Sequence, residues 1–286
     1  MINKFILFGG SGFLGQSFTS YLKSKNFDYI KIGSLDINLL LNDNKKQIHE
    51  LTKYENATYV FFSALTPDKG KDINTFEKNI LMAKNFLDNF NYNNLENKQI
   101  IYISSDAVYP LSIETISDEI LPTPTDLYSA MHLTREIMFK TKFLNNLTIV
   151  RPTLIYGFGD THNSYGPNRF FKQMIADKSI KIFGEGIDMR DHLYISDFCN
   201  LIYNFGTKKI LGTYNVASGK SISYIELANT FKNLFSNHLS EISKIEVNNK
   251  ISKRFFDIKN LENKFNFKPS NLENNLQEYF NSLMSD

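Results

Sequence analysis

The sequence predicts an α/β fold, a doubly wound parallel sheet with helices on both faces. Two observations lead to this prediction. Short apolar runs alternate with amphipathic helical patterns over the first half of the chain, and the first of these runs passes directly into a series of glycines. A chain of 286 residues is also long enough to bury the core of a second, smaller lobe.

Five apolar runs rich in β-branched and aromatic residues are the expected strands: 4–8, 29–32, 58–64, 99–104 and 147–150. Helical patterns lie between them, and the longest are 76–90 and 127–143. Each of these two places its apolar side chains three and four residues apart, on one helical face. Strands that alternate with helices in this way run parallel, because each helix carries the chain back to the start of the next strand.

Gly9, Gly12 and Gly15 are the strongest functional signal. They lie between the first strand and a helix whose apolar face begins at Leu14. Glycine allows a tight turn and a close approach of backbone amides to a pyrophosphate, and the N-terminus of the helix favours negative charge. We therefore expect a bound dinucleotide, held by these glycines together with Phe13 and Leu14. No Gly-Lys-Ser/Thr follows the glycines, so the segment is not a P-loop.

A second group of polar residues indicates the chemistry. Ser104 and Ser105 end the fourth apolar run, and Tyr128 lies 23 residues beyond Ser105, at the start of the helical stretch 127–143. Ligands bind at the carboxyl ends of parallel strands, where a serine and a tyrosine can meet. There the serine can hold a carbonyl or alcohol oxygen while the phenol gives or takes the proton as hydride moves to or from a nicotinamide. Taken singly, the serines also fit a turn and the tyrosine fits helix packing.

Composition narrows the classes of function. The formal net charge of +2 gives no reason to expect nucleic acid or a membrane surface as a partner, and no apolar run approaches the roughly 20 residues of a bilayer span. Cys199 is the only cysteine, which excludes an intrachain disulfide and favours a cytoplasmic location. Arginine is rare, since 27 lysines stand against five arginines, at positions 135, 151, 169, 190 and 254. A guanidinium binds phosphate oxygens in pairs, so these arginines are candidate ligand contacts.

These motifs resemble those of the extended short-chain dehydrogenase/reductases, in particular the nucleotide-sugar epimerase/dehydratase group. The resemblance extends over almost the whole chain. It rests on Gly9 to Gly15 (Gly-x-x-Gly-x-x-Gly), Ser104 to Tyr109 (Ser-Ser-x-x-Val-Tyr), Arg151 to Gly157 (Arg-Pro-x-x-x-Tyr-Gly) and Arg190 to Asp197 (Arg-Asp-x-x-x-x-x-Asp), with similar segments at 76–80, 165–170 and 212–219.

The resemblance implies NAD(P) as cofactor and a nucleotide-diphosphate sugar as substrate, and it allows a homodimer. The catalytic residues that it implies are Ser105, Tyr128 and His132. The implied cofactor-binding residues are Gly9, Gly12, Phe13, Leu14, Gly15, Ser34, Asp36, Ala64, Asn79, Ser104, Tyr128 and His132. The implied substrate-binding residues are Asp106, Asn168, Arg169 and Arg190, the last as a contact of the diphosphate.

The implied fold is a Rossmann-type domain with a smaller C-terminal substrate lobe. We expect residues 1–151, plus part of 184–216, to form the NAD(P)-binding domain, and residues 152–183 and 217–286 to form the substrate lobe. Between Tyr156 and Pro167 the chain is rich in Gly, Asp, Asn and Ser and is expected to be a long loop, of a length that is often functional.

One departure from the family pattern lies four residues after Tyr128, where the pattern has lysine and this chain has His132. A lysine supplies a permanent positive charge, which lowers the pKa of a neighbouring phenol. Histidine has an ordinary pKa of about 6.5 and is mostly neutral at pH 7 unless a carboxylate lies beside it. We therefore expect a working site whose activity depends on pH. An inactive relative is the alternative.

The second departure concerns NAD or NADP. At Gly33, where a ribose-binding carboxylate often ends the second strand, no acid is present, and Ser34 follows. Asp36 could reach the ribose or could match the adenine-contacting Asp-Ile segment of the family. Because no carboxylate at the strand end repels a 2′-phosphate, and because Lys31 and Ser34 are close, the sequence leans weakly towards NADP.

The expected function is oxidation and reduction at C4 of a nucleotide-diphosphate sugar, by a 4-epimerase or a 4-keto reductase that supplies polysaccharide precursors. Dehydratases of this group carry an acidic pair just after the serine, whereas here Ser105 is followed by Asp106 and an alanine. Dehydration therefore ranks lower. The alternative is a protein that binds NAD(P) without turnover, as a sensor or a structural protein.

A metal site and a serine hydrolase are less favoured interpretations of the sequence. His162 and His192 have Asp160 and Asp191 close by, but no tight ligand spacing supports a metal site, and none is expected. A serine hydrolase would need a Gly-x-Ser-x-Gly elbow, which the sequence lacks.

Overall fold

The computed structural model describes residues 3–160, 163, 165–247 and 251–285, and the chain divides into two compact units. Unit 1 comprises residues 1–110, 121–152 and 199–215, and unit 2 comprises residues 111–120, 153–198 and 216–286. The expected boundaries left residues 111–120 in the first domain. They group with unit 2 because β5 (Thr115–Ile116) pairs with β13 (Phe255–Phe256).

Unit 1 is built on a six-stranded sheet in the order β10-β6-β4-β3-β1-β2, whose pairs from β2 to β6 are all parallel. Its strands are β1 (Lys4–Phe8), β2 (Tyr29–Ile32), β3 (Ala57–Phe61), β4 (Lys98–Ile103), β6 (Leu147–Pro152) and β10 (Gly212–Val216). This confirms the doubly wound parallel sheet expected from the sequence.

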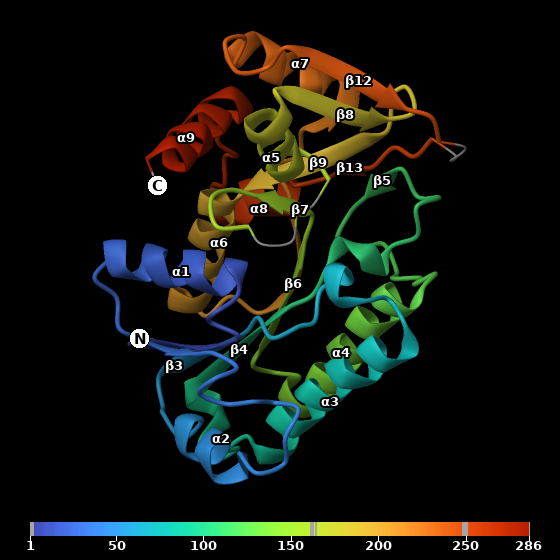
Figure 1. Ribbon diagram of the computed structural model, residues 1–286. Coiled ribbons are helices and arrows are strands. Elements are labelled where there is room, and N and C mark those ends of the chain that lie inside the picture. The colour runs from blue at the N-terminus through green and yellow to red at the C-terminus, as the bar shows by residue number, and fades with distance from the viewer. Residues whose placement is uncertain (1–2, 161–162, 164, 248–250, 286) are drawn as a thin grey trace. The chain divides into compact units, whose positions relative to one another are not determined.

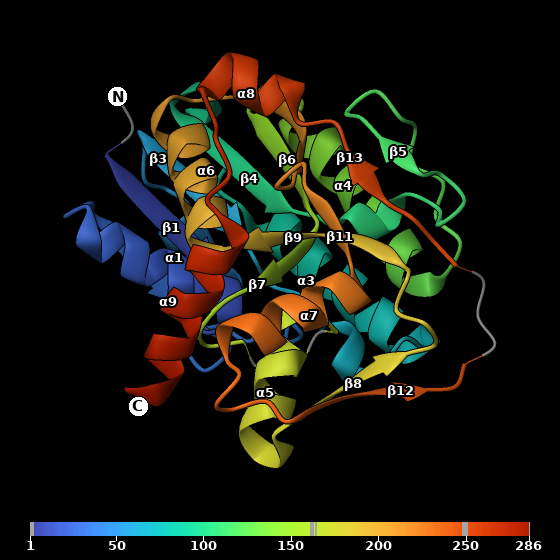
Figure 2. The same ribbon diagram turned by 90° about the horizontal axis from the view of Figure 1, so that it is seen from above.

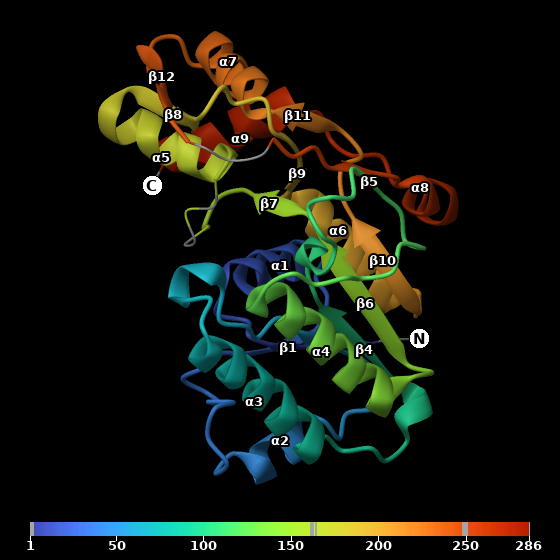
Figure 3. The same ribbon diagram turned by 90° about the vertical axis from the view of Figure 1, so that its right-hand side faces the viewer.

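Helices cover both faces of this sheet, as Figures 1 and 3 show. One face carries α2 (Lys45–Leu51), α3 (Ile73–Asn89) and α4 (Leu127–Phe143), and the other carries α1 (Phe13–Ser24) and α6 (Ile195–Thr207). On the first face Phe86 and Phe139 pack against Phe61 of β3. On the second, Phe18 packs edge-on against Phe5 of β1 with ring centroids 5.2 Å apart. The amphipathic patterns of the sequence therefore bury their apolar faces as expected.

The strand β3 is shorter than the expected run 58–64, since it ends at Phe61. The N–H of Phe62 still donates a hydrogen bond to the carbonyl of Phe8 in β1 (2.8 Å), and the residues after it are held by side chains. Arg135 donates a hydrogen bond to the carbonyl oxygen of Ser63 (2.5 Å), and the amide of Asn79 binds both the N–H (2.8 Å) and the carbonyl (3.1 Å) of Leu65. Residues 62–64 are half-buried and include the polar Ser63, and they no longer form a strand.

Unit 2 has three small sheets, β11-β9-β7, β12-β8 and β13-β5. Its further strands are β7 (Leu154–Tyr156), β8 (Ser179–Phe183), β9 (Met189–Tyr194), β11 (Ser221–Ser223) and β12 (Glu241–Ile245), and its helices are α5 (Pro167–Asp177), α7 (Tyr224–Leu234), α8 (Lys259–Phe265) and α9 (Leu272–Met284). Figure 2 shows α5 and α7 beside the β8–β12 pair. The three longer helices meet in an aromatic core, where Phe171 contacts Phe231 of α7 and Tyr279 of α9.

In the part of the chain that the structure describes, no helix is both long and apolar enough to cross a lipid bilayer. The same residues contain no cluster of three metal-ligating side chains. His162, which entered the metal alternative, lies outside the described residues.

Candidate active site

The carboxyl ends of β1, β3 and β4 lie side by side at one edge of the sheet of unit 1, because these three strands are neighbours. β1 leads into the glycines at 9–15, β3 into residues 62–66, and β4 into Ser104 and Ser105. Ligands of doubly wound sheets bind at this edge. The topology therefore brings the glycine loop and the candidate catalytic serine to the same place.

The glycine loop folds too tightly for side chains at two of its positions. A Cβ on Gly15 would lie 2.5 Å from the carbonyl oxygen of Gly9, which is far inside a normal contact. A Cβ on Gly9 would lie 2.6 Å from the backbone nitrogen of Ser63, and Gly9 also has a φ of +87°. Glycine is needed at both positions to let β1, the loop and α1 pack together.

The start of α1 is open. A Cβ on Gly12, which begins the helix, would meet nothing closer than 3.6 Å, and no side chain caps this helix. The first N–H groups of α1, from Phe13 and Leu14 onward, therefore lack a side-chain partner and carry the positive end of the helix dipole. Such a helix start fits the pyrophosphate of a dinucleotide.

The turn after β2 brings an acid and a lysine to this loop. The Asp36 carboxylate accepts a hydrogen bond from the N–H of Gly33 (2.7 Å), and a Cβ on Gly33 would lie 2.9 Å from the hydroxyl oxygen of Ser11. Ser34 is exposed in the same turn, and the side chain of Lys31 packs over the glycine loop. The structure thus places Ser34 and Asp36 in a turn beside the glycine loop, together with Lys31.

Local structure fixes the position of Tyr128. Helix α4 begins with a capping box, in which Asp126 accepts a hydrogen bond from the N–H of Ser129 (2.7 Å) and the Ser129 hydroxyl lies 3.1 Å from the N–H of Asp126. Tyr128 follows this cap in the first turn. Ser105 is held in a similar way, because its hydroxyl accepts a hydrogen bond from the N–H of Ala107 (3.1 Å) at the start of the 3₁₀ turn η3 (Asp106–Val108).

The side chains of Ser105 and Tyr128 meet. Burial raises the pKa of Tyr128 to about 12, and a hydrogen bond with the Ser105 side chain acts against this rise. The negative charges of Asp106 and Asp126 raise the pKa of the phenol further, and the positive charge of Arg135 lowers it. The serine and the tyrosine are therefore close enough to share one substrate oxygen.

His132 is a buried, neutral imidazole. Its side chain is 4% exposed, its Nδ1 lies 3.2 Å from the hydroxyl of Tyr102, and its ring packs edge-on against Tyr128 with centroids 4.8 Å apart. Burial and the charge of Arg135 lower the pKa of His132 to about 3. A pKa lowered this far argues against the expectation that His132 makes the site pH-sensitive. Its buried Nε2 has no hydrogen-bond partner among the described residues.

Three of the expected cofactor contacts lie in the supporting structure. The Asn79 amide is occupied by the backbone of Leu65 and the carbonyl of Thr75 (3.0 Å), so that it fixes the loop containing the half-buried Ala64. The Ser104 hydroxyl donates a hydrogen bond to the carboxylate of Glu136 (2.6 Å). These side chains hold the loops on which the site is built.

Glu136 belongs to a buried network that sequence reasoning missed. Two nitrogens of Arg151 donate hydrogen bonds to its two carboxylate oxygens (2.9 and 2.7 Å), and both side chains are buried. A third nitrogen of Arg151 donates to the hydroxyl of Tyr109 (2.7 Å), which in turn donates to Asn215 (2.9 Å). The pairing with Glu136 raises the pKa of Arg151 against the effect of burial. A glutamate on the buried face of an amphipathic helix was the signal available in the sequence.

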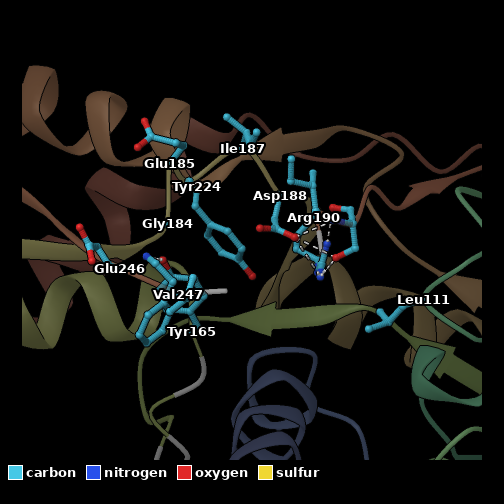
Figure 4. A pocket seen from close by; sticks show the side chains of 14 residues that line it. Leu111, Tyr165, Gly184, Glu185, Ile187, Asp188, Arg190, Tyr224, Glu246 and Val247 are labelled. Atoms are coloured by element: carbon cyan, nitrogen blue, oxygen red, sulfur yellow. Dashed lines mark hydrogen bonds and ion pairs between the residues drawn. The ribbon is translucent and has the colours of Figure 1, made fainter. Parts of the chain in front are cut away.

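Unit 2 contains a separate cavity of about 1060 Å³, shown in Figure 4. Arg190 and Asp188 lie next to each other on its wall, 4.0 Å apart, and Arg190 also donates hydrogen bonds to the hydroxyl (2.6 Å) and the carbonyl (3.0 Å) of Ser252. The aromatic rings of Tyr165 and Tyr224 lie 4.2 Å apart on the same cavity. The cavity therefore offers flat aromatic surface, one guanidinium and the carboxyl groups of Glu185, Asp188 and Glu246.

The expected substrate residues are not all at this cavity. Arg190 lines it, and the guanidinium of Arg169 lies over the ring of Tyr165 (5.7 Å), which also lines it. Asn168 is buried, and its amide binds the N–H of Gly157 (3.0 Å) at the end of β7. Asp106 belongs to unit 1, in the turn that follows Ser105.

The model of the NAD dependent epimerase/dehydratase family matches residues 5–217 of this chain. A curated relative, the GDP-6-deoxy-D-talose 4-dehydrogenase of Aggregatibacter actinomycetemcomitans, is 24% identical over 228 residues, which cover 78% of this chain and 77% of the relative.

Two solved structures share the fold at low sequence identity. RMD from Pseudomonas aeruginosa, complexed with NADPH, has a TM-score of 0.81 at 19% identity, with 96% of each chain covered. An NAD dependent NDP-hexosamine 5,6-dehydratase involved in tunicamycin biosynthesis has a TM-score of 0.83 at 14% identity, with 99% of this chain and 98% of that chain covered.

Proposed function

Since the chain belongs to the NAD dependent epimerase/dehydratase family, whose members use NAD(P), we propose that it oxidises or reduces C4 of a nucleotide-diphosphate sugar, as a 4-epimerase or a 4-keto reductase. The observation that carries the proposal is the meeting of the Ser105 and Tyr128 side chains beside the glycine loop. One oxygen of a substrate can bind both hydroxyls there.

The structure of the glycine loop fits the cofactor. The uncapped start of α1 and the free space at Gly12 suit a pyrophosphate, and the unpartnered Nε2 of His132 suits a ribose hydroxyl. When bound, the nicotinamide supplies or accepts the hydride. The choice between NAD and NADP stays a prediction, and the weak lean to NADP rests on the lack of an acid at Gly33 together with Lys31 and Ser34.

In this proposal Tyr128 is the proton donor and acceptor at the C4 oxygen, and Ser105 holds that oxygen by a hydrogen bond. His132 contributes a neutral nitrogen and carries no charge. Asp106 is the one acid directly after the serine, so the chain lacks the acidic pair that the family resemblance implies for loss of water. This favours epimerisation or reduction over dehydration.

The cavity of unit 2 is the proposed site for the nucleotide. A base can stack on the rings of Tyr165 or Tyr224, and the guanidinium of Arg190 can bind a diphosphate oxygen. The carboxylate of Asp188 lies next to Arg190 and would repel a diphosphate. Arg190 would therefore have to give up part of its contact with Asp188 to bind the ligand.

The test is a turnover assay on the purified chain. Nucleotide 4-keto sugars are offered with NADH and NADPH while cofactor absorbance is followed, and nucleotide hexoses are offered with catalytic NAD while epimers are separated. A reductase consumes one reduced cofactor per turnover, and an epimerase consumes none.

Variants then connect turnover to the site. Tyr128→Phe and Ser105→Ala should each lower kcat by about 10²- to 10⁴-fold while the dissociation constant of the cofactor stays within a few-fold. Tyr92→Phe is the matched control, because its half-buried hydroxyl binds the carbonyl of Leu87 away from the loop. Full activity of Tyr128→Phe would exclude the mechanism, and cofactor binding without any turnover would favour the sensor alternative.

A further inference from the structure

Arg135 is a buried cation without a carboxylate partner among the described residues. Its side chain is 1% exposed. Its guanidinium donates hydrogen bonds to the carbonyl of Ser63 (2.5 Å) and, at 3.4 Å, to the side-chain oxygen of Asn79, while its Nε has no partner. The other buried guanidinium of this unit, that of Arg151, is paired with an acid. A buried charge is costly unless it is paired, so the lone charge of Arg135 calls for an explanation.

Aromatic faces hold the rest of this guanidinium. Its carbon lies 5.0 Å from the centre of the Phe61 ring and 5.3 Å from that of Tyr102. Ring faces attract a cation and carry no negative charge of their own. The positive charge of Arg135 is therefore held in place without being neutralised.

Arg135 lies on the same face of α4 as the candidate catalytic tyrosine. Residues 128, 132 and 135 are spaced by four and three, which stacks their side chains along one side of a helix. Tyr102 contacts both Arg135 and His132. The guanidinium of Arg135 lies over its ring, and its hydroxyl lies 3.2 Å from Nδ1 of His132. Asn79, the partner of Arg135, also lines a small cavity together with Tyr128.

We propose that Arg135 is the fixed positive charge that assists Tyr128 in this chain, in place of the lysine that is absent at position 132. The proposal rests on the proposed function. Arg135 acts as a positioning residue, through its electric field on the phenol and not through contact with a substrate. Buried charges act on one another strongly because little water screens them.

The charge of Arg135 acts on two groups of the site, Tyr128 and His132. The charges that face Tyr128 are those of Asp106, Asp126 and Arg135, and Lys71 and Asp72 line the small cavity from the start of α3. Among the three charges that act on the pKa of Tyr128, only that of Arg135 lowers it. Burial and, after it, the same charge lower the pKa of His132, and the charge of Arg135 also opposes the rise in the pKa of Tyr128.

The direct test reads the ionisation of Tyr128 without a substrate. Difluorotyrosine at position 128 gives a single ¹⁹F signal and a lower phenol pKa, which makes the titration measurable in the folded chain. Arg135→Met should leave about tenfold less phenolate at the same pH, the effect expected for loss of a nearby charge. Arg135→Lys should keep the titration of the parent. Adding His132→Lys to Arg135→Met should restore it, because the charge returns at the family position.

A measurement on the unaltered chain keeps the proposal testable should Arg135→Met fail to fold. The ring signals of the five histidines are followed by NMR from pH 5 to 9, and His132→Gln assigns the signal of residue 132. The His132 signal should stay constant over this range. A His132 titration near pH 6.5, or the same Tyr128 titration in Arg135→Met as in the parent, would overturn the proposal. Both readouts are independent of turnover, so a chain that shows the expected titrations and no activity contradicts the proposed function alone.

Discussion

Replacement of Glu136 by glutamine tests whether the network behind the candidate site holds unit 1 together. The Glu136 carboxylate is fully buried and accepts hydrogen bonds from Ser104 and from two nitrogens of Arg151. Glu136→Gln keeps the size of the side chain and one acceptor oxygen but removes the negative charge. The guanidinium of Arg151 is then left buried and uncompensated.

The expected cost is set by that uncompensated charge. Breaking a buried ion pair by removing one partner costs about 3 to 5 kcal/mol, and we expect about 3 kcal/mol because the glutamine can still accept one hydrogen bond. At an m-value of about 3 kcal/mol per M of urea, the unfolding midpoint of unit 1 should fall by about 1 M. Circular dichroism reports the midpoint, and hydrogen exchange of the α4 amides confirms that unit 1 is the part that opens.

An exposed pair on the neighbouring helix provides the matched control. Lys84 and Asp88 form an i,i+4 ion pair on α3 with both side chains about half exposed, so Asp88→Asn should change stability by less than about 0.5 kcal/mol. Replacing both members of the buried pair, as Glu136→Leu with Arg151→Met, should recover part of the loss, because no lone charge remains. Equal, small effects of Glu136→Gln and Asp88→Asn would refute the reasoning.

Three further changes test other parts of unit 1. Gly15→Ala should lower both the melting temperature and the affinity for NAD(H), because a Cβ at this position has no room. Gly12→Ala should weaken cofactor binding and leave the melting temperature unchanged. Calorimetry measures both quantities, and equal melting temperatures of the two variants would contradict the packing argument. Lys31→Met should weaken NADPH several-fold more than NADH in a binding titration, and an equal loss would remove the lean to NADP. The pKa of His132 is about 3 in the folded chain and about 6.5 in the unfolded chain, so only the unfolded chain binds a proton here between these values. The free energy of unfolding is therefore unaffected above pH 6.5 and falls as the pH falls, by about 2 kcal/mol at pH 5. His132→Gln should therefore lose less stability than the parent between pH 7 and 5 in urea titrations, with the exposed His238→Gln as control, and an unchanged pH dependence would disprove the assignment.

Much of the fold was predictable because its signals are local. The spacing of apolar residues predicted α4 with both of its ends, and the capping residues Asp126 and Ser129 agree with its start. The strands β1 and β2 also match the expected runs. The end of β3 was predicted too late, because Phe62 and Ala64 continue the apolar pattern after the strand has ended.

The sequence could not predict which charged side chains are paired at the site. The sequence shows that His132 stands where a lysine is expected, and that arginine is rare. It does not show that Arg135 lies between Phe61 and Tyr102 without an acid, or that Glu136, its neighbour in the chain, pairs with Arg151 instead. Successive residues of a helix point in different directions, so adjacent charges can have unrelated surroundings.

The sequence by itself determined the family, the parallel sheet and the kind of cofactor, because glycine spacing and apolar periodicity act over a few residues and survive without knowledge of distant neighbours. Only the tertiary structure lowered the pKa of His132 and brought Ser105 to Tyr128. Burial and the field of a charge depend on all the atoms around a group, and these come from strands and helices that lie far apart along the chain.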